Sequence, residues 1–231
     1  MKATPPGTLA RAMFVTFEGI DRSGKSTQAA MLAEALGPEA LLVREPGGTP
    51  AGERIRTLLK DPALELDPAA ELLLFAAARA ELCRTVIEPA LGAGRDVVCD
   101  RFIDSTAAYQ GIARGLGLET VERLNAFAIG PCVPDLTILL RVDPDEAIDR
   151  GQQRLAEGGE DGADRFEAEG EPLQRQVAAA YDHLATLHPE RIRTVPADGT
   201  QQEVHALVLD LVGAQAKPSA ETDQAGSPAA S

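Results

Sequence analysis

The chain has 231 residues, with 22 Lys and Arg against 36 Asp and Glu, and a formal net charge of −14 at pH 7. This length suits one domain with a sizeable hydrophobic core. An acidic surface repels nucleic acid, and no apolar stretch is long enough to span a membrane. The composition therefore argues against nucleic-acid and membrane partners.

Cysteine usage and the first residues bear on the cellular compartment. The three cysteines, Cys83, Cys99 and Cys132, are widely spaced in apolar runs, unlike the cysteines of a disulfide framework or a metal site. Residues 1–6 lack the apolar segment of a secretion signal. We therefore expect a cytoplasmic protein with reduced cysteines in its core.

Strands and helices alternate along the chain. Five apolar, partly β-branched runs predict strands at residues 13–18, 41–44, 96–100, 136–142 and 192–195. Segments with helical spacing lie between them, among them residues 25–36, 68–91, 116–129 and a helix that begins at Asp143 and Pro144. This order predicts an α/β fold of three layers, in which helices flank a five-stranded, mainly parallel sheet.

The domain boundaries follow from composition. We expect one folded domain over residues 12–212, with a flexible segment at 1–11 and a disordered tail at 213–231, because both ends have little to bury. Residues 157–162 are rich in glycine and charge, which predicts a flexible surface loop.

A phosphate-binding signature follows the first predicted strand. Residues 19–27 read Gly-Ile-Asp-Arg-Ser-Gly-Lys-Ser-Thr, the P-loop pattern G-x-x-x-x-G-K-[ST] between a strand and a helix. Lys25 would reach the β- and γ-phosphates, and the Ser26 hydroxyl would coordinate Mg²⁺. The alternative is a plain glycine turn. The motif predicts a P-loop NTPase-type fold that binds ATP through Gly19, Ile20, Asp21, Arg22, Ser23, Gly24, Lys25, Ser26 and Thr27.

Polar residues also end the third predicted strand. Asp100 could hold Mg²⁺ through water or accept a proton from a substrate hydroxyl, and the planar fork of Arg101 could clamp a phosphate. A structural ion pair is the alternative. Parallel strands bring these residues to the same edge of the sheet as the P-loop.

Six ordered motifs resemble those of the thymidylate kinase family, over about residues 12–212. They are Phe-Glu-Gly-Ile-Asp at 17–21 leading into the P-loop, Arg-Glu-Pro-Gly-Gly-Thr at 44–49, Asp-Arg-Phe at 100–102, Tyr-Gln-Gly at 109–111, Pro-Asp-Leu at 134–136 and Asp-Arg-Phe-Glu at 164–167. The resemblance implies transfer of the ATP γ-phosphoryl group to dTMP with Mg²⁺, giving dTDP for dTTP synthesis. It also implies a homodimer and a mobile lid at about 150–167.

The same resemblance implies the acceptor site. It places dTMP against Asp21, Glu45, Arg56, Phe75, Arg79, Arg101, Thr106, Tyr109, Gln110 and Phe166. In this view Phe75 stacks on thymine and Arg79, one helical turn later, bonds a thymine carbonyl oxygen. Taken alone, Phe75 would be a core residue and Arg56 a solvated helix arginine.

The source of the catalytic charge is the point on which the family divides. Some members carry an arginine in the P-loop and others use the lid, whereas this chain has Arg22 in the loop and Arg150 and Arg154 in the lid segment. We favour Arg22, assisted by Arg154 or Arg150. Ordinary pairing of a lid arginine with Glu146 is the alternative. The expected catalytic residues are Arg22, Lys25, Asp100, Arg101 and Arg154, with Ser26 and Asp100 as metal-binding residues.

Two other functions stay open on sequence alone. A related kinase could take dUMP or a deoxynucleoside, although two arginines, Arg56 and Arg101, favour an acceptor that already carries a phosphate. A P-loop switch protein is the other class, but the guanine-reading tetrapeptide Asn-Lys-x-Asp does not occur in the chain.

Overall fold

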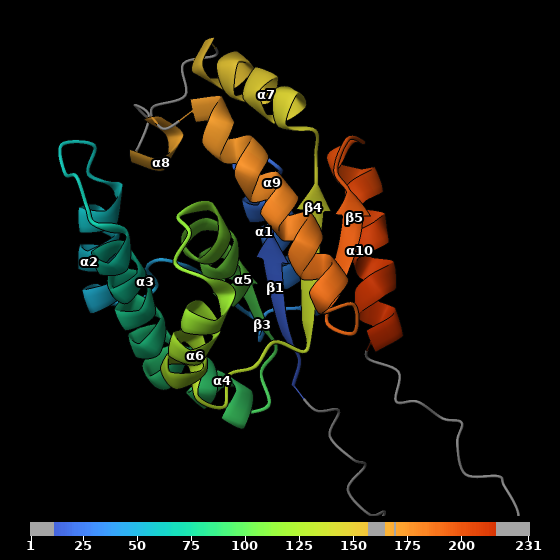
Figure 1. Ribbon diagram of the computed structural model, residues 1–231. Coiled ribbons are helices and arrows are strands. Elements are labelled where there is room, and N and C mark those ends of the chain that lie inside the picture. Colours follow the sequence, from blue (N-terminus) through green and yellow to red (C-terminus); the bar gives the residue numbers. More distant parts are fainter. Residues whose placement is uncertain (1–11, 157–164, 169, 216–231) are drawn as a thin grey trace, which may run out of the picture.

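The computed structural model describes residues 12–156, 165–168 and 170–215. Within them, strands and helices alternate in the predicted order (Figure 1). The strands are β1 (Phe14–Glu18), β2 (Leu41–Arg44), β3 (Val97–Asp100), β4 (Leu136–Arg141) and β5 (Ile192–Pro196). The first helices are α1 (Lys25–Leu36), α2 (Pro50–Lys60), α3 (Pro68–Leu82), the π-helical turn η1 (Cys83–Ile87) and α4 (Glu88–Gly92). There follow α5 (Ile103–Thr106), the π-helical η2 (Ala107–Ala113), α6 (Leu118–Ile129), α7 (Pro144–Ala156), α8 (Arg165–Ala168), α9 (Gly170–Leu187) and α10 (Gln201–Gln215).

The five strands form one parallel sheet in the order β2-β3-β1-β4-β5. Each strand lies within one residue of its predicted bounds, and the α/β class is confirmed. Successive side chains of a strand point to opposite faces. Accordingly, Phe14 and Val15 of β1 belong to different hydrophobic clusters, as do Val97 and Val98 of β3.

Helices cover both faces of the sheet. On one face α1 packs against β1, β3 and α10, and α9 crosses the other face in front of β1 and β4 (Figure 1). The strand order changes direction at β1, which has β3 on one side and β4 on the other. A ligand site is therefore expected beyond the carboxyl end of β1, where the P-loop begins.

The predicted helix at 68–91 is wrong in one respect, because it is not a single α-helix. The α-helical pattern stops at Leu82, five residues wind as the π-helical turn η1, and α4 then begins at Glu88. Pro89 explains the change: it has no N–H to donate to the carbonyl of Thr85, and its ring crowds the turn before it. The helix predicted at 116–129 begins two residues later, at Leu118.

The termini of the domain need a smaller correction. Helix α10 continues to Gln215, whose side-chain amide donates to the carbonyl oxygen of Asp135 at 3.3 Å, so residues 213–215 of the predicted tail are helical. The predicted flexible segments 1–11 and 157–162, and residues 216–231 of the predicted tail, lie outside the described residues. The domain boundaries stay predictions.

Two further expectations concern composition. Cys83, Cys99 and Cys132 are all free thiols in the interior, as predicted. Across the described ranges, every helix is too short or too polar to cross a membrane.

Candidate functional site

A cavity of about 980 Å³ opens at the carboxyl ends of β1, β2 and β3. The P-loop, the turn after β2, helix α3 and the segment after β3 all contribute side chains to its wall. The predicted residues that line it include Asp21, Arg22, Lys25, Ser26, Glu45, Arg56, Phe75, Asp100, Arg101, Thr106, Tyr109, Gln110 and Phe166. A cavity of this size, with polar groups from several elements, is the form of a small-molecule site.

The P-loop backbone has the conformation that the motif predicts. Gly19 has a φ of +140°, and a Cβ there would lie 2.5 Å from the carbonyl oxygen of Leu140, so only glycine fits. Lys25 is buried, and its ammonium donates to the carbonyl of Ile20 at 2.5 Å and to the hydroxyl of Ser23 at 3.3 Å. Burial, followed by the positive charge of Arg101, lowers the pKa of Lys25 to about 8.

Arg22 occupies an unusual backbone position within the loop. Its φ of +64° lies in the left-handed region, which a non-glycine residue rarely adopts. The side chain is half-buried and lines the cavity. A strained backbone thus holds a guanidinium group on the phosphate side of the site.

Ser26 and Asp100 meet at the end of β3, as the sequence predicts. The Ser26 hydroxyl donates to Asp100 Oδ2 at 2.5 Å. The other carboxylate oxygen, Oδ1, is buried and accepts no hydrogen bond from the described residues. A hydroxyl beside a carboxylate with one unused oxygen fits Mg²⁺, which proteins usually hold with one or two carboxylates, water and substrate phosphate. In the described part of the chain, clusters of three or more His, Cys, Asp or Glu side chains suited to a metal are lacking.

Arg101 joins β3 to the P-loop. Its guanidinium forms an ion pair with Asp21 and donates to the carbonyl of Gly19 at 3.2 Å. Its backbone φ is +70°, the second left-handed arginine of the site. Burial acts to raise the pKa of Asp21, but the charges of Arg101 and Lys25 outweigh it and hold that pKa below its usual range.

Glu18 is a buried carboxylate that the predicted site residues do not include. It ends β1 and accepts hydrogen bonds from the backbone N–H of Phe102 at 2.8 Å, the hydroxyl of Ser105 at 2.6 Å and the hydroxyl of Tyr181 at 2.8 Å. Burial, followed by the charge of Asp104, raises the pKa of Glu18 to about 7. The sequence did carry a signal for Glu18: it is the one charged residue in a strand whose other residues are mostly apolar.

Arg79 lies deeper than the resemblance implies. Its side chain is 1% exposed and does not line the cavity. It donates to Glu45 at 2.8 Å, Asn125 at 2.6 Å and Thr106 at 2.8 Å, and it also bonds the carbonyl of Phe102. The structure therefore gives Arg79 the task of fixing the turn after β2 and the segment after β3, and its contact with a base stays a prediction.

Three aromatic rings form one side of the cavity. The centroid of Phe166 lies 5.9 Å from that of Phe75 and 6.2 Å from that of Tyr109. Phe75 is half-buried, so it is a wall residue and not a core residue, and Phe166 comes from α8, within the predicted lid segment. The rings contact one another, and together they give this side of the cavity an apolar aromatic wall.

The remaining predicted arginines differ in their surroundings. Arg56 donates to the carbonyl of Pro46 at 2.9 Å and lines the cavity. Arg150, which also lines the cavity, pairs with Glu146 at 2.5 Å and donates to the carbonyl of Ala197. This is the i,i+4 pairing that the sequence left open. The side chain of Arg154 lies outside the described residues.

Helix α9 supplies two site residues that sequence reasoning missed. Gln174 donates to the carboxylate of Asp21 at 2.8 Å and accepts from its backbone N–H at 3.2 Å. Tyr181, seven residues later, bonds Glu18. Helix α9 therefore holds one acid of the P-loop and the acid that ends β1, although neither Gln174 nor Tyr181 lines the cavity.

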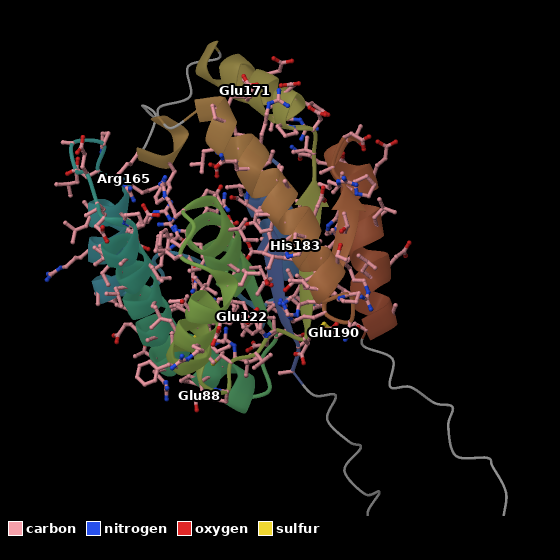
Figure 2. The ribbon with its side chains drawn as sticks, viewed as in Figure 1. Glu88, Glu122, Arg165, Glu171, His183 and Glu190 are labelled. Carbon is pink, nitrogen blue, oxygen red and sulfur yellow. The ribbon has the colours of Figure 1, made fainter. Side chains whose placement is uncertain are left out.

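Glu71 at the start of α3 is a third residue without a sequence signal. It is 1% exposed and pairs with Arg165 of α8 at 2.5 Å. Arg165 also donates to the carbonyl of Leu59 at 3.0 Å, and its guanidinium lies 4.5 Å from the centroid of the Phe166 ring. Figure 2 shows Arg165 on α8, beside the ends of α2 and α3.

Comparisons with known proteins return one consistent description. A family model described as thymidylate kinase matches residues 17–208. Thymidylate kinases from Syntrophotalea carbinolica and Desulfosudis oleivorans are 47% and 45% identical to the chain, over 84% and 83% of it and 91% and 92% of their own lengths. The crystal structure of thymidylate kinase from Ehrlichia chaffeensis, 35% identical, has a TM-score of 0.67 over 87% of this chain and 98% of that one.

Proposed function

The chain belongs to the thymidylate kinase family, and from that premise we propose that its cavity is where the γ-phosphoryl group of ATP passes to the phosphate of dTMP. The product is dTDP, an intermediate of dTTP synthesis. One observation carries the proposal: Arg101 contacts both the P-loop and the aromatic wall. Its guanidinium pairs with Asp21 and lies 5.6 Å from the centroid of the Tyr109 ring. A triphosphate site and a base site are thereby held in one cavity of about 980 Å³.

The donor half of the site is the P-loop. Its backbone N–H groups and the start of α1 would face the phosphates of ATP, and Lys25 would add a positive charge beside them. Since phosphoryl transfer needs little covalent chemistry from the protein, the work of these groups is to position the phosphates in line and to balance their charge.

The acceptor half lies between the aromatic wall and two arginines. Phe75 would stack on thymine, Phe166 would pack beside Phe75, and Tyr109 would pack beside the sugar. Arg56 and Arg101 would hold the dTMP phosphate, which a deoxynucleoside lacks. A kinase whose acceptor is a monophosphate therefore accounts for both arginines better than a deoxynucleoside kinase does.

Ser26 and Asp100 are the residues that would hold Mg²⁺. When bound there, Mg²⁺ would supply positive charge that offsets part of the phosphate charge. The two side chains already touch, so they would bring the ion to the β3 edge of the P-loop.

Arg22 is the residue to which we assign the main catalytic charge. It lines the cavity from within the P-loop, and its left-handed backbone, with a φ of +64°, belongs to the loop itself. A guanidinium fixed by the backbone near the transferred group stabilises charge that develops in the transition state.

Oligomeric state and compartment extend the proposal. We place a homodimer interface on the adjoining helices α2, α3 and α6, which expose Leu58 at 48%, Leu73 at 58% and Phe127 at 79%. Contiguous exposed apolar surface marks protein contact sites, and in the proposed dimer these three side chains would be covered by the partner. Free buried cysteines suit a reducing compartment, and we propose the cytoplasm.

A coupled assay with ATP, Mg²⁺ and a panel of nucleoside monophosphates tests the function. We expect multiple turnovers with dTMP, slower turnover with dUMP and no turnover with thymidine. Efficient phosphorylation of thymidine would show that the acceptor phosphate plays no part. Nucleotide binding without turnover of any acceptor would favour a switch protein and overturn the proposal.

A further inference from the structure

Glu71 is a buried carboxylate on which two parts of the cavity wall converge. Its Oε1 accepts from the side-chain amide of Gln110 at 2.6 Å and from Arg114 at 3.4 Å. Its Oε2 pairs with Arg165 at 2.5 Å. Gln110 lies in η2, Arg114 directly follows it, and Arg165 begins α8. The Glu71 carboxylate therefore links η2 and α8 to α3.

The contact with Glu71 fixes the orientation of the Gln110 amide. A glutamine amide has a donating NH₂ end and an accepting carbonyl end, and its neighbours decide which way it points. A carboxylate that pairs with guanidinium groups offers only acceptors. Glu71 therefore takes the NH₂ end, and the carbonyl oxygen is the end that Gln110 can present to the cavity it lines.

The aromatic rings do not distinguish one pyrimidine from another, so base selection depends on the carbonyl end of the Gln110 amide. Phe75 lines the cavity with a flat apolar ring, and every pyrimidine has a flat face that can stack on such a ring. Thymine and cytosine differ along their hydrogen-bonding edge instead. At ring position 3 thymine carries an N–H donor, whereas cytosine carries a lone pair.

We propose that Glu71 is a positioning residue that makes the site select thymine over cytosine, by holding the Gln110 carbonyl toward the base. The inference rests on the proposed function and deepens it. A carbonyl accepts from the thymine N–H but would face the cytosine lone pair, and two acceptors cannot bond. Buried sites built to bond one such group reject an analogue without it by factors of about 10⁴–10⁵.

The test is Glu71→Gln, assayed with dTMP and dCMP as competing acceptors. A glutamine at this position keeps the shape and can either donate or accept, so the Gln110 amide becomes free to turn. We expect the ratio of kcat/KM for dTMP to that for dCMP to fall at least about tenfold. The change should come mainly from a higher KM for dTMP and a lower KM for dCMP.

Two variants separate this role from a merely structural one. Arg165→Met removes the ion pair at Oε2 but leaves the bond to Gln110, so it should keep the ratio even if both rates fall. The exchange Glu71→Gln with Gln110→Glu keeps one amide and one carboxylate, and now a carboxylate oxygen faces the base. This double variant should retain the preference for dTMP even if Glu71→Gln alone does not fold.

The outcomes are distinct. If the wild-type enzyme does not phosphorylate dTMP, the proposed function fails first. If it does, and Glu71→Gln lowers both rates while the ratio stays the same, the inference about Glu71 is wrong and the function stands. Loss of the dTMP preference in the exchange variant would also overturn the inference.

Discussion

Arg79 and Glu45 form an ion pair in the interior of the protein, 2.6 Å apart, with side chains that are 1% and 3% exposed. The pair joins α3 to the turn after β2, and burial raises the pKa of Glu45 despite the partner. A charge buried in this way depends on its partner, because removing one member leaves the other desolvated and unpaired.

We therefore expect Arg79→Met to lower the free energy of unfolding by about 3–5 kcal/mol at pH 7. Urea unfolding followed by circular dichroism measures it. The matched control is Arg44→Met, which breaks the exposed pair of Arg44 with Glu53 and should cost less than about 1 kcal/mol. Equal losses in the two variants would contradict a special role for the buried pair.

Arg22→Ala should reduce the turnover number by about 10²-fold or more, because it removes the charge that we assign to the transition state. The KM for dTMP should change little. Steady-state kinetics at saturating ATP checks this, with Arg54→Ala on the exposed side of α2 as the control. An unchanged turnover number in Arg22→Ala would move the catalytic charge to the lid.

The activity should also depend on the protonation of Lys25. Its pKa of about 8 in the free protein means that the ammonium is present below pH 8 and lost above it. Since kcat/KM reports the free enzyme, the value for ATP should fall about tenfold per pH unit above 8. In Lys25→Arg the side chain stays charged, so this fall should disappear even if the activity is lower. Persistence of the fall would assign it to another group.

Ser26→Ala should raise the Mg²⁺ concentration needed for half-maximal velocity by about tenfold or more, because one of two neighbouring oxygens is lost. A Mg²⁺ titration at constant ATP measures the shift. Thr57→Ala, an exposed hydroxyl on α2, should leave the titration unchanged. If Ser26→Ala keeps the wild-type Mg²⁺ dependence, the hydroxyl does not bind the ion.

Phe127→Glu should convert the proposed dimer to a monomer, since it places a charge in an apolar contact. Sedimentation velocity across a concentration series gives the mass. Leu209→Glu on α10, a residue 40% exposed away from α6, should leave the mass unchanged. A wild-type protein that sediments as a monomer at every concentration would exclude the interface.

The fold and the phosphate half of the site could be predicted because their signals are local. The apolar, β-branched strands and the spacing of the P-loop lie within short stretches, and Ser26 and Asp100 meet because parallel strands end at one edge. The break after Leu82 was missed because residues 83–87 contain neither glycine nor proline, and its cause, Pro89, comes later. Local pattern does not reveal where a helix changes its winding.

The supporting residues of the site could not be predicted, because each acts on a partner far away in the chain. Tyr181 is 163 residues from Glu18, and Gln174 is 153 residues from Asp21. Glu71 lies in an ordinary first helical turn, where an acid is expected for its effect on the helix dipole. Only the folded chain shows that the carboxylate is enclosed and that it holds Gln110.

The spacing of Gln174 and Tyr181 limits how this protein can vary in length. The two residues are seven positions apart, close to two helical turns, so both side chains face β1 and the P-loop. One inserted or deleted residue between them would rotate the second contact by about 100° and release either Asp21 or Glu18. Additions before Gly170 leave this spacing untouched. Insertions and deletions in related or engineered proteins should therefore occur before α9 and not between Gln174 and Tyr181.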